Sequence, residues 1–481
     1  MPVPSFPTSS PPLPRPIVEQ LARETWDLLV VGGGIVGAGI ARDAALRGLR
    51  VALVDERDFA AGTSSRSSRL LHGGIRYLAQ GRVGLVREAN LEKTVVQHIA
   101  PHLCQPLPFI FPTRRGTPWK RWKLAMGVKL YDLLCGRRNL GRSQSLSVGQ
   151  TLELLPGLNR QGLTGAARYF DGMTNDARLV FDTLRSAALA GATCSNYTQF
   201  VQAEPDGNLW RATLRDSHSG EDISLSTRAI VNAAGPWSDR IPGSRTSLRV
   251  TKGVHLVIDR NRLPIPDAVV TPEGERILFA IPWGERVILG TTDTDYDGPL
   301  AEPPCTRADA EYVLEVINSA FPTANLTSDD VISTWSGLRP LVADPHGKPS
   351  DISRRHRIEM SHPGWWDVTG GKLTTYRLMA EETVDKVVTQ LGIHASGCIT
   401  DKTPLLPPES LHASGILPPT ATASLIAHYC ESEWARHLDD VMVRRTSLRY
   451  YHREHRDLAR QVADWMATSL GWSHETTQQE L

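Results

Sequence analysis

Runs of apolar residues near the start of the chain predict a strand, a helix and a second strand. Residues 28–31 are all apolar, which is typical of a strand buried on both faces. Residues 35–45 place apolar side chains at helical spacing, and Asp43 and Arg47 stand four residues apart on the polar side. Residues 51–54 form a second apolar run. This order predicts a βαβ unit within an α/β domain.

The turn inside this unit carries glycines at the spacing of a phosphate-binding loop. Gly32, Gly34 and Gly37 form the pattern Gly-x-Gly-x-x-Gly. The first glycine permits the tight turn, the second lets backbone approach a pyrophosphate, and the third lets the helix pack on the strand. The helix N-terminus adds N–H groups and a positive dipole end. Asp55 follows the second strand and can hold ribose hydroxyls, so the unit is predicted to bind a dinucleotide.

The rest of the chain mixes helical and strand patterns. We predict helices at residues 83–100, 175–190, 307–320 and 374–391, and strands at 229–232, 249–258, 277–282 and 286–290, with two more around a turn at 205–207. The 229–232 strand is expected to return the chain to the dinucleotide sheet. Residues 101–118 hold five prolines and are predicted to form a loop.

Residues 119–135 predict a basic amphipathic helix. Its apolar stripe, at spacings of three and four residues, consists of Trp119, Trp122, Met126, Leu130 and Leu133, and cations take the other faces. Such a helix can lie in a membrane interface, with tryptophan at the headgroup boundary. The alternative is that the stripe packs on the protein's own core, and the pattern leaves both open.

Composition excludes several classes of function. The chain has 481 residues and a net charge of +1, so two or three domains are expected and no global field favours nucleic acid. Its six cysteines lie far apart, which is typical of reduced thiols and not of a metal site. No apolar run reaches the length of a membrane-spanning helix. Residues 1–25 are rich in proline and are predicted to be a disordered leader.

A second stretch with candidate chemistry follows Asp55. Residues 58–77 combine hydroxyls, glycines and cations, with Thr63-Ser64-Ser65 and His72-Gly73-Gly74 as its most concentrated parts. In such a loop, hydroxyl and N–H groups can contact the phosphates and the ring edge of a flavin. The alternative is an ordinary surface loop. The position directly after the predicted ribose ligand favours the cofactor.

These motifs together resemble the FAD-dependent glycerol-3-phosphate dehydrogenases. The glycine-rich turn with Arg47-Gly48 is similar to the first family signature, and Gly370-Gly371-Lys372-x-x-Thr375-Tyr376-Arg377 is similar to the second. Further matches are Ser67-Ser68-x-x-x-His72-Gly73-Gly74-x-Arg76-Tyr77, Lys252-Gly253-x-His255, Ile281-Pro282-Trp283, Gly290-Thr291-Thr292-Asp293 and Ser336-Gly337-x-Arg339-Pro340. The resemblance covers residues 26–380 and continues weakly to Arg444-Arg445-Thr446. Between Arg377 and Trp434 the chain is shorter than the well-known bacterial enzymes.

The resemblance implies the fold of D-amino acid and glycine oxidases. This fold is α/β, with a Rossmann-type FAD-binding domain and a second, antiparallel-sheet substrate domain, here followed by a short helical C-terminal segment. The implied FAD-binding domain is discontinuous, at 26–105, 160–245 and 335–395. The substrate domain would take 106–159 and 246–334, and the C-terminal cap 396–481.

The resemblance also implies the site residues. The catalytic set is His255, Arg339 and Lys372, and the substrate would be bound by these three together with Arg76, Tyr77 and Arg354. The chemistry agrees, because arginine and lysine suit a phosphomonoester and histidine can accept a proton near neutral pH. Noncovalent FAD would be bound by Gly32, Gly34, Gly37, Asp55, Thr63, Ser64, Ser65, His72, Gly73, Gly74, Ala234, Gly235, Trp237, Gly371, Lys372, Leu373 and Thr374. No metal is implied.

The implied reaction oxidises sn-glycerol 3-phosphate to dihydroxyacetone phosphate, with a hydride going to flavin N5 and electrons onward to a quinone. The implied location is the cytoplasm, peripheral on the inner face of the membrane, and a homodimer is left open. Two alternatives stay open: an oxidase of glycerol phosphate or of another small hydroxy or amino acid that uses oxygen, and a flavin-bound sensor without turnover. The cationic cluster disfavours an amino acid substrate, and the presence of His255, Arg339 and Lys372 disfavours the sensor.

Overall fold

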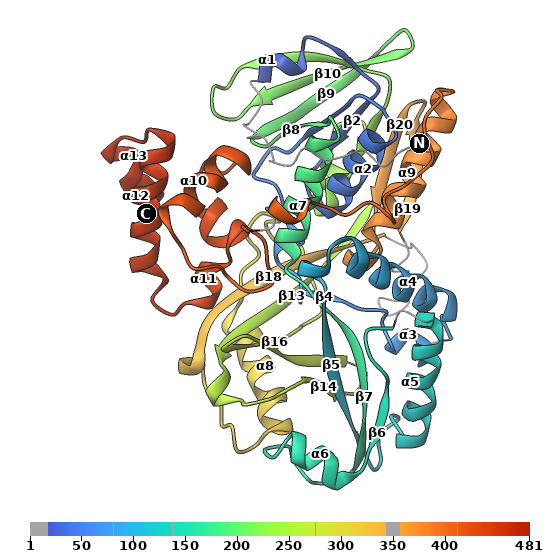
Figure 1. Ribbon diagram of the computed structural model, residues 1–481, viewed down its shortest axis with the longest axis vertical. Helices are drawn as coiled ribbons and strands as arrows, with labels where there is room; N and C mark the ends of the chain where they lie inside the picture. Colours follow the sequence, from blue (N-terminus) through green and yellow to red (C-terminus); the bar gives the residue numbers. More distant parts are fainter. Residues whose placement is uncertain (1–17, 80, 137–138, 275, 343–355, 411) are drawn as a thin grey trace.

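Two sheet systems and a C-terminal helical lobe make up the molecule (Figure 1). The computed structural model describes residues 18–79, 81–136, 139–274, 276–342, 356–410 and 412–481. Most of the predicted leader lies outside the described residues, and the short helix α1 (Val18–Leu21) falls within its predicted range. Among the described residues, no helix has both the length and the apolar character needed to cross a membrane.

The first sheet is built on the predicted βαβ unit. Its six strands run in the order β19 (Arg357–His362), β20 (Trp365–Thr369), β12 (Ile230–Asn232), β2 (Leu28–Val31), β3 (Val51–Val54) and β8 (Thr193–Ser195). All neighbours pair in parallel except β19 and β20. The predicted return of the chain at 229–232 is confirmed, because β12 pairs directly with β2.

Helices cover one face of this sheet and a smaller sheet covers the other. The helices are α2 (Ile35–Leu46), α7 (Asp176–Leu189) and α9 (Tyr376–Leu391). On the opposite face, side chains of β2 and β3 pack against an antiparallel sheet formed mainly by β9 (Thr198–Asp206), β10 (Leu209–Asp216) and β11 (Asp222–Thr227), to which β1 (Thr25–Trp26) adds in parallel. The expected pair of Asp43 and Arg47 forms at 2.6 Å on α2.

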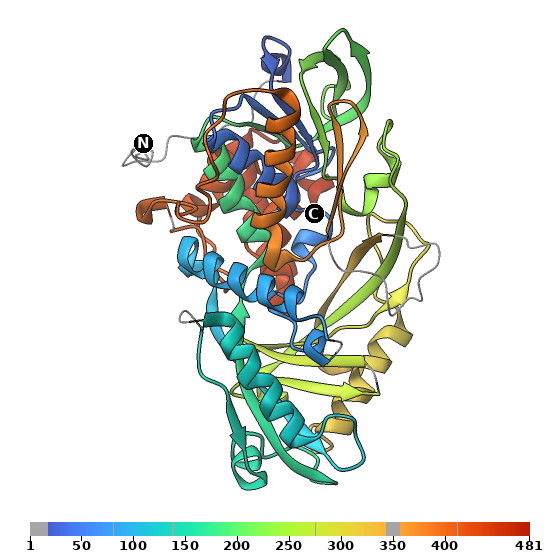
Figure 2. The ribbon, with the colours of Figure 1, turned by 90° about the vertical axis from the view of Figure 1, so that its right-hand side faces the viewer.

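The second system is a large, mostly antiparallel sheet in the lower half of Figures 1 and 2. Its described strands are β17 (Thr294–Asp295), β13 (Leu248–Asp259), β16 (Arg286–Gly290), β15 (Arg276–Trp283), β14 (Ala268–Glu273), β5 (Gln105–Arg114), β7 (Leu163–Met173) and β4 (Leu70–Leu71), with β18 (Val331–Val342) on β13 and β6 (Gln144–Leu146) on β7. The predicted hairpin around Gly284 is confirmed by the pairing of β15 with β16.

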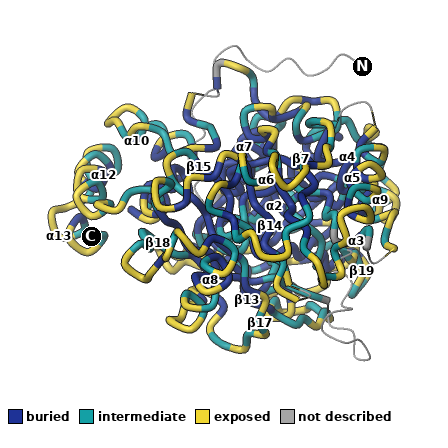
Figure 3. The backbone as a smooth tube through the Cα atoms, turned by 90° about the horizontal axis from the view of Figure 1, so that it is seen from below, coloured by how far each residue is buried: buried dark blue, intermediate teal, exposed yellow. Residues whose placement is uncertain are grey.

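Helices also pack on the large sheet. One apolar cluster joins α8 (Arg307–Ala320) to β13 and β16, and α6 (Val148–Leu154) lies at its edge. A second joins α4 (Val83–Ile99) and α5 (Arg121–Cys135) to β5 and β7, and the short helix α3 (Arg76–Ala79) precedes α4. Figure 3 shows this buried interior surrounded by exposed turns.

The predicted loop at residues 101–118 is wrong, because most of it is the strand β5. The strand pairs with β7 along its length, with Pro106 opposite Gly172 and Pro112 opposite Ala166. Pro106, Pro108 and Pro112 have even spacings, so their missing N–H groups face one edge and the residues between them pair with β7. On its other side, β5 pairs with β14 only at Phe109 and Ile110.

The C-terminal lobe lies beside α7 and β18 on one side of the molecule (Figure 1). It consists of α10 (Ala423–Ser432), a π-helical turn (Asp440–Arg445), α11 (Leu448–Tyr451), α12 (His455–Leu470) and α13 (His474–Glu480). Its apolar core includes Ile426, Tyr429, Val462 and Met466. Ionic contacts of buried arginines join this lobe to the first sheet system.

Candidate active site

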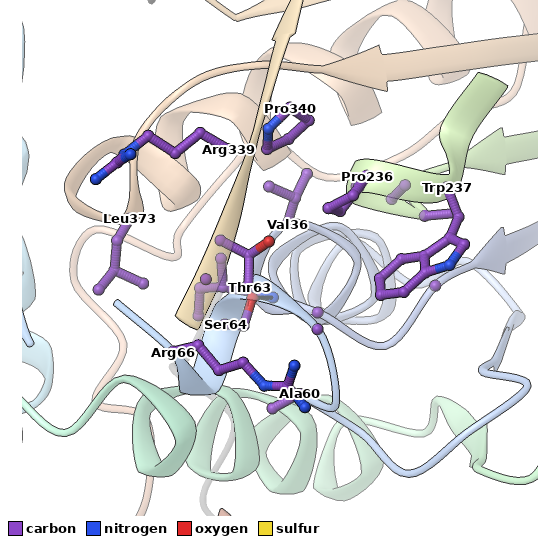
Figure 4. Close-up of a pocket in the computed structure, with 18 of the residues that line it drawn as sticks. Val36, Ala60, Thr63, Ser64, Arg66, Pro236, Trp237, Arg339, Pro340 and Leu373 are labelled. Atoms are coloured by element: carbon purple, nitrogen blue, oxygen red, sulfur yellow. Dashed lines mark hydrogen bonds between the residues drawn. The ribbon is translucent and has the colours of Figure 1, made fainter. Parts of the chain in front are cut away.

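A cavity of about 350 Å³ opens at the carboxyl ends of β2 and β3 and reaches β13 and β18 of the large sheet. It is lined by the glycine-rich turn, the 60–68 loop, the turn after β12 and the connection from β20 to α9. Figure 4 shows Arg339 and Trp237 on opposite sides of this pocket, with Thr63 and Ser64 between them. The crevice beyond the carboxyl ends of parallel strands is where open α/β sheets bind ligands.

The glycine-rich turn is held close to the start of α2. A Cβ at Gly37 would lie 1.9 Å from the carbonyl oxygen of Gly32, so only glycine permits this approach. The hydroxyl of Ser64 accepts the N–H of Ile35 at 3.0 Å, at the first turn of the helix. Thr63 donates its hydroxyl to the Leu338 carbonyl at 2.6 Å. The 3₁₀ turn Thr63–Ser65 therefore joins the helix start to β18.

Asp55 lies at the end of β3 with its carboxylate inside the cavity lining. One oxygen accepts the N–H of Gly33 at 2.7 Å and the other the N–H of Arg57 at 2.9 Å. Burial raises the pKa of Asp55 to about 7, although both of these hydrogen bonds act in the opposite direction. Backbone N–H groups therefore orient the carboxyl group, and its oxygens can accept a further hydrogen bond from a hydroxyl group.

Replacing Asp55 with alanine is expected to weaken FAD binding by about 1.5–3 kcal/mol, or about 10- to 150-fold in Kd, because a hydrogen bond to a charged group is lost. Titration of the FAD-free protein with FAD, followed by flavin fluorescence, measures this. Unchanged affinity would show that Asp55 is not the ribose ligand.

The same carboxyl group predicts a pH dependence of FAD affinity. Ribose hydroxyls bind a carboxylate more strongly than a neutral carboxyl, and the pKa of Asp55 near 7 leaves the group partly protonated at neutral pH. FAD affinity of the wild type should therefore rise as the pH is raised from 6 to 8, with release of a proton on binding. In Asp55→Ala this rise should disappear, and an identical rise in that variant would contradict the assignment.

The far end of the cavity brings together two of the predicted catalytic residues. His255 lies on β13 and is buried, with Nε2 2.8 Å from the hydroxyl of Ser68 and its ring stacked on Trp335 at 5.2 Å. Burial, together with the positive charges of Arg339 and Arg69, lowers the pKa of His255 to about 3. The imidazole is therefore neutral at physiological pH.

Arg339 projects from β18 to the same end of the cavity. Its guanidinium donates to Asp293 Oδ1 at 3.1 Å and to Thr291 Oγ1 at 3.1 Å. A Cβ at Gly253 would lie 2.3 Å from Arg339 Nη2, which explains the glycine between Lys252 and His255. Asp293 is half exposed and fixes the arginine from its outer side. The guanidinium is thus held in place by a carboxylate and a hydroxyl group.

Lys372 is the third predicted catalytic residue, and it lies in the connection between β20 and α9. Its Nζ stands 4.2 Å from the centre of the Tyr77 ring, a cation–π contact. Thr374, two residues on, accepts the N–H of His72 at 3.0 Å. These contacts bring Tyr77 and His72 beside Lys372. Arg76 begins α3 next to them, and Arg354 lies outside the described residues.

Most of the predicted cofactor ligands line the cavity. They are Gly32, Gly34, Asp55, Thr63, Ser64, His72, Ala234, Gly235, Trp237, Gly371, Lys372, Leu373 and Thr374. Gly37, Ser65, Gly73 and Gly74 are not part of the lining. Gly73 instead donates its N–H to the hydroxyl of Tyr131 at 2.8 Å, so the structure gives it a supporting contact behind the cavity.

The sequence did not reveal several residues that reach the site only because the fold brings distant segments together. Ser68 lies in a stretch singled out for its hydroxyls, but nothing in that stretch pointed to His255, 187 positions away. Trp335, which stacks on His255, had no signal of its own. Asp293, the partner of Arg339, was visible only as part of a motif.

Comparison with known proteins agrees with this arrangement. The model of the FAD dependent oxidoreductase family matches residues 27–386, and that of the C-terminal domain of alpha-glycerophosphate oxidase matches residues 413–477. A glycerol-3-phosphate dehydrogenase of Mycobacterium leprae is 37% identical over 96% of this chain and 88% of its own length. An aerobic glycerol-3-phosphate dehydrogenase of Staphylococcus aureus is 39% identical over 80% of this chain and 71% of its own.

A solved structure shows the same relationship. The glycerol-3-phosphate dehydrogenase from Bacillus halodurans, complexed with FAD, has a TM-score of 0.77 and 29% identity, over 96% of this chain and 94% of that one. The residues present here fit that cofactor, since the start of α2 faces the cavity and Asp55 offers its carboxylate beside it. FAD is the cofactor, and the chain belongs to the FAD-dependent oxidoreductase family, alongside glycerol-3-phosphate dehydrogenases.

Proposed function

We propose that this protein oxidises sn-glycerol 3-phosphate to dihydroxyacetone phosphate and passes the electrons to a quinone. The observation that carries the proposal is the meeting of His255, Arg339 and Lys372 at one FAD cavity. Relatives that cover most of the chain are named glycerol-3-phosphate dehydrogenases, which supports the same substrate. The division into an FAD-binding domain and a substrate domain is part of this proposal, with the large sheet forming the substrate side.

The cations suit a phosphorylated substrate. A phosphomonoester carries about −1.5 to −2 charges near neutral pH. Arg339 can offer a two-pronged donor and Lys372 a point charge. Arg339 is already fixed by Asp293 and Thr291, so little side-chain entropy is lost when it binds an anion. Arg76, Tyr77 and Arg354 complete the proposed set.

His255 is the proposed proton acceptor. Its low pKa keeps it neutral, and Ser68 fixes the imidazole by its contact with Nε2. The proton of the substrate's C2 hydroxyl would pass to this imidazole while Arg339 stabilises the negative charge that develops on oxygen. FAD, held by the glycine-rich turn and Asp55, would supply the acceptor for the hydride that leaves C2. Together these transfers convert the alcohol to a ketone.

Steady-state turnover tests the reaction and its acceptor. With sn-glycerol 3-phosphate as donor, we expect rapid reduction of an artificial dye or a short-chain quinone and slow formation of hydrogen peroxide in air. Fast peroxide formation would favour the alternative, an oxidase that uses oxygen. Absence of flavin reduction by this substrate would overturn the proposed reaction. Acid precipitation of the same preparation should release all the yellow colour, because FAD is proposed to be noncovalent.

We further propose that α5 holds the protein on a membrane surface, at the cytoplasmic side. The helix buries Leu124, Val128, Tyr131 and Cys135 in its own protein core. The predicted stripe lies on another face, with Trp122 58%, Met126 60%, Leu130 40% and Leu133 75% exposed. These four side chains are exposed among the described residues, which favours the membrane alternative, while Trp119 packs against Phe111. Lys120, Arg121, Lys123 and Lys129 are exposed around the stripe.

Vesicles of phosphatidylglycerol and phosphatidylcholine should bind the protein at low salt and less at high salt, since each cation near an anionic surface adds about 1 kcal/mol. The double variant Trp122→Ser, Leu133→Ser should lose most of this binding. Met360→Ser, which removes a similarly exposed apolar side chain from β19, serves as the control and should bind as the wild type does. Equal co-sedimentation of all three proteins would contradict the role of α5.

A further inference from the structure

The loop after β3 turns two of its residues away from the cofactor. From Val54 to Ser64, every residue lines the cavity except Asp58 and Phe59. Both of these side chains are almost fully buried. They face the C-terminal lobe, which contributes no residue to the cavity lining in the described part of the chain. The loop is therefore held between the cofactor site on one side and the C-terminal lobe on the other.

Asp58 is bound by two arginines of the π-helical turn. Arg444 Nε donates to Oδ2 at 2.5 Å, while Arg445 donates to Oδ2 through Nη1 and to Oδ1 through Nη2, the latter at 2.9 Å. All three side chains are buried. Asn196 donates to Oδ1 at 3.0 Å from the same Nδ2 that reaches the Trp434 carbonyl at 2.9 Å. A buried carboxylate with this many charged donors fixes the loop firmly.

Phe59 forms a second connection, between the C-terminal lobe and the glycine-rich turn. Its ring packs edge-on against Trp434 of the C-terminal lobe, with ring centres 5.4 Å apart. On its other side, a Cβ at Gly33 would lie 2.3 Å from Phe59 Cδ1. The next residue, Ala60, donates its N–H to the Gly33 carbonyl at 3.1 Å. Gly33, between the first two glycines of the phosphate-binding pattern, is thus in direct contact with a ring that packs against the lobe.

Trp434 itself is fixed by its surroundings. Its φ of +60° lies in the left-handed region, where a bulky side chain is held only when the contacts around it demand it. The carbonyl of the preceding residue, Glu433, accepts Arg445 Nη2 at 2.6 Å. Arg445 therefore holds both Asp58 and the backbone next to Trp434. We call Asp58, Phe59, Trp434, Arg444 and Arg445 the loop clamp.

We propose that the C-terminal lobe is a positioning element for FAD, which acts through the loop clamp. The loop clamp fixes the positions of the 55–64 loop and of the glycine-rich turn. These two segments provide the predicted ribose and pyrophosphate contacts. Docking of the lobe and binding of FAD then favour each other, and the effect is reciprocal, so FAD also stabilises the docked lobe. The inference rests on FAD binding alone and is independent of the substrate.

The affinity of the FAD-free protein for FAD, measured by flavin fluorescence, tests the clamp. Asp58→Asn keeps the shape of the side chain but removes its charge, and should raise the FAD Kd about tenfold or more, as expected for weakened hydrogen bonds to a charged group. Trp434→Phe should raise it less, about two- to tenfold, since it weakens one aromatic contact. Arg449→Met is the control, because Arg449 pairs with Asp439 on the same lobe in an exposed contact, and should leave the Kd unchanged.

Hydrogen exchange provides a readout that does not depend on activity. FAD should slow exchange of the backbone at residues 433–446 in the wild type, and this protection should be reduced in Asp58→Asn. If FAD leaves exchange of this segment unchanged, or if Asp58→Asn and Trp434→Phe both bind FAD as the wild type does, the proposal is wrong. Should Asp58→Asn fail to fold, the Kd of the milder Trp434→Phe decides. If the variants and hydrogen exchange behave as expected but glycerol 3-phosphate is not turned over, only the proposed function is contradicted.

Discussion

Replacing Arg339 with alanine is expected to lower kcat/KM for sn-glycerol 3-phosphate by about 10- to 150-fold, because one charge-assisted contact worth about 1.5–3 kcal/mol is lost. The fold should tolerate the change, since the partner Asp293 is half exposed and can be solvated. If Arg339 also stabilises charge on the reacting oxygen, kcat should fall as well as KM rise. Steady-state kinetics with a dye acceptor measure both parameters.

Glycerol is the internal control for this experiment. It lacks the phosphate and gains nothing from the cation, so its slow turnover should change much less in Arg339→Ala. Lys372→Ala separates two roles of that residue. A phosphate role makes its loss specific to the phosphorylated substrate, whereas a role toward the flavin's negative charge slows both substrates alike and lowers the flavin reduction potential. Equal losses for glycerol and glycerol 3-phosphate in both variants would defeat the phosphate assignment.

Replacing Arg178 with methionine is expected to lower the free energy of unfolding by about 3–5 kcal/mol, because the change leaves buried carboxylates without their main partner. Arg178 lies on α7 and binds Glu433 through Nη1 at 2.6 Å and through Nη2 at 2.9 Å. The same Nη2 donates to Asp182 at 2.9 Å. All three side chains are almost fully buried. Arg185, at 3.3 Å from Glu433, compensates only in part.

The sign of the pH dependence follows from the carboxyl groups. Arg178 and its neighbours hold the pKa of Glu433 well below its usual value, and the pKa of Asp182 is also lowered, even though burial opposes both shifts. Their contribution to stability is present above the pKa of the unfolded chain and is lost as the pH falls through the folded values. The deficit of Arg178→Met should therefore be largest at neutral pH and smaller near pH 4.

Denaturant unfolding of the FAD-bound protein, followed by circular dichroism at both pH values, measures this deficit. Arg307→Met is the matched control, since Arg307 pairs with Glu311 one turn away on α8 in an exposed contact. It should cost no more than about 0.5 kcal/mol. A deficit of the same size in both variants would show that the buried network adds nothing beyond an ordinary surface pair.

Local patterns predicted the parts of the fold that depend on near neighbours. The run at 28–31, the glycines at 32, 34 and 37 and the pair of Asp43 and Arg47 are all contained within one βαβ unit, and the structure contains each of them. The hairpin around Gly284 and the helix ending at Ala320 followed for the same reason. Strong periodicity and turn residues act over a few positions, so the sequence expresses them directly.

Two local patterns gave incomplete information, because tertiary packing decided which structure or which exposed face they produced. The prolines of β5 argued for a loop, yet a strand with one fully paired edge accommodates them when they share the other edge. On α5, one apolar stripe was predicted and two exist. Leu124 and Val128 face the core, and Trp122 and Leu133 face outward. Periodicity reveals a stripe but not the surface that it will meet.

The sequence by itself determined the cofactor class, the glycine-rich turn of the first βαβ unit and the candidate cations. Only the tertiary structure decided which distant residues meet: Ser68 with His255, Asp293 with Arg339, and Asp58 with Arg444 and Arg445. The physical reason is that these contacts join segments separated by tens to hundreds of residues. They form only after both sheet systems and the C-terminal lobe have packed, and no local propensity encodes that packing.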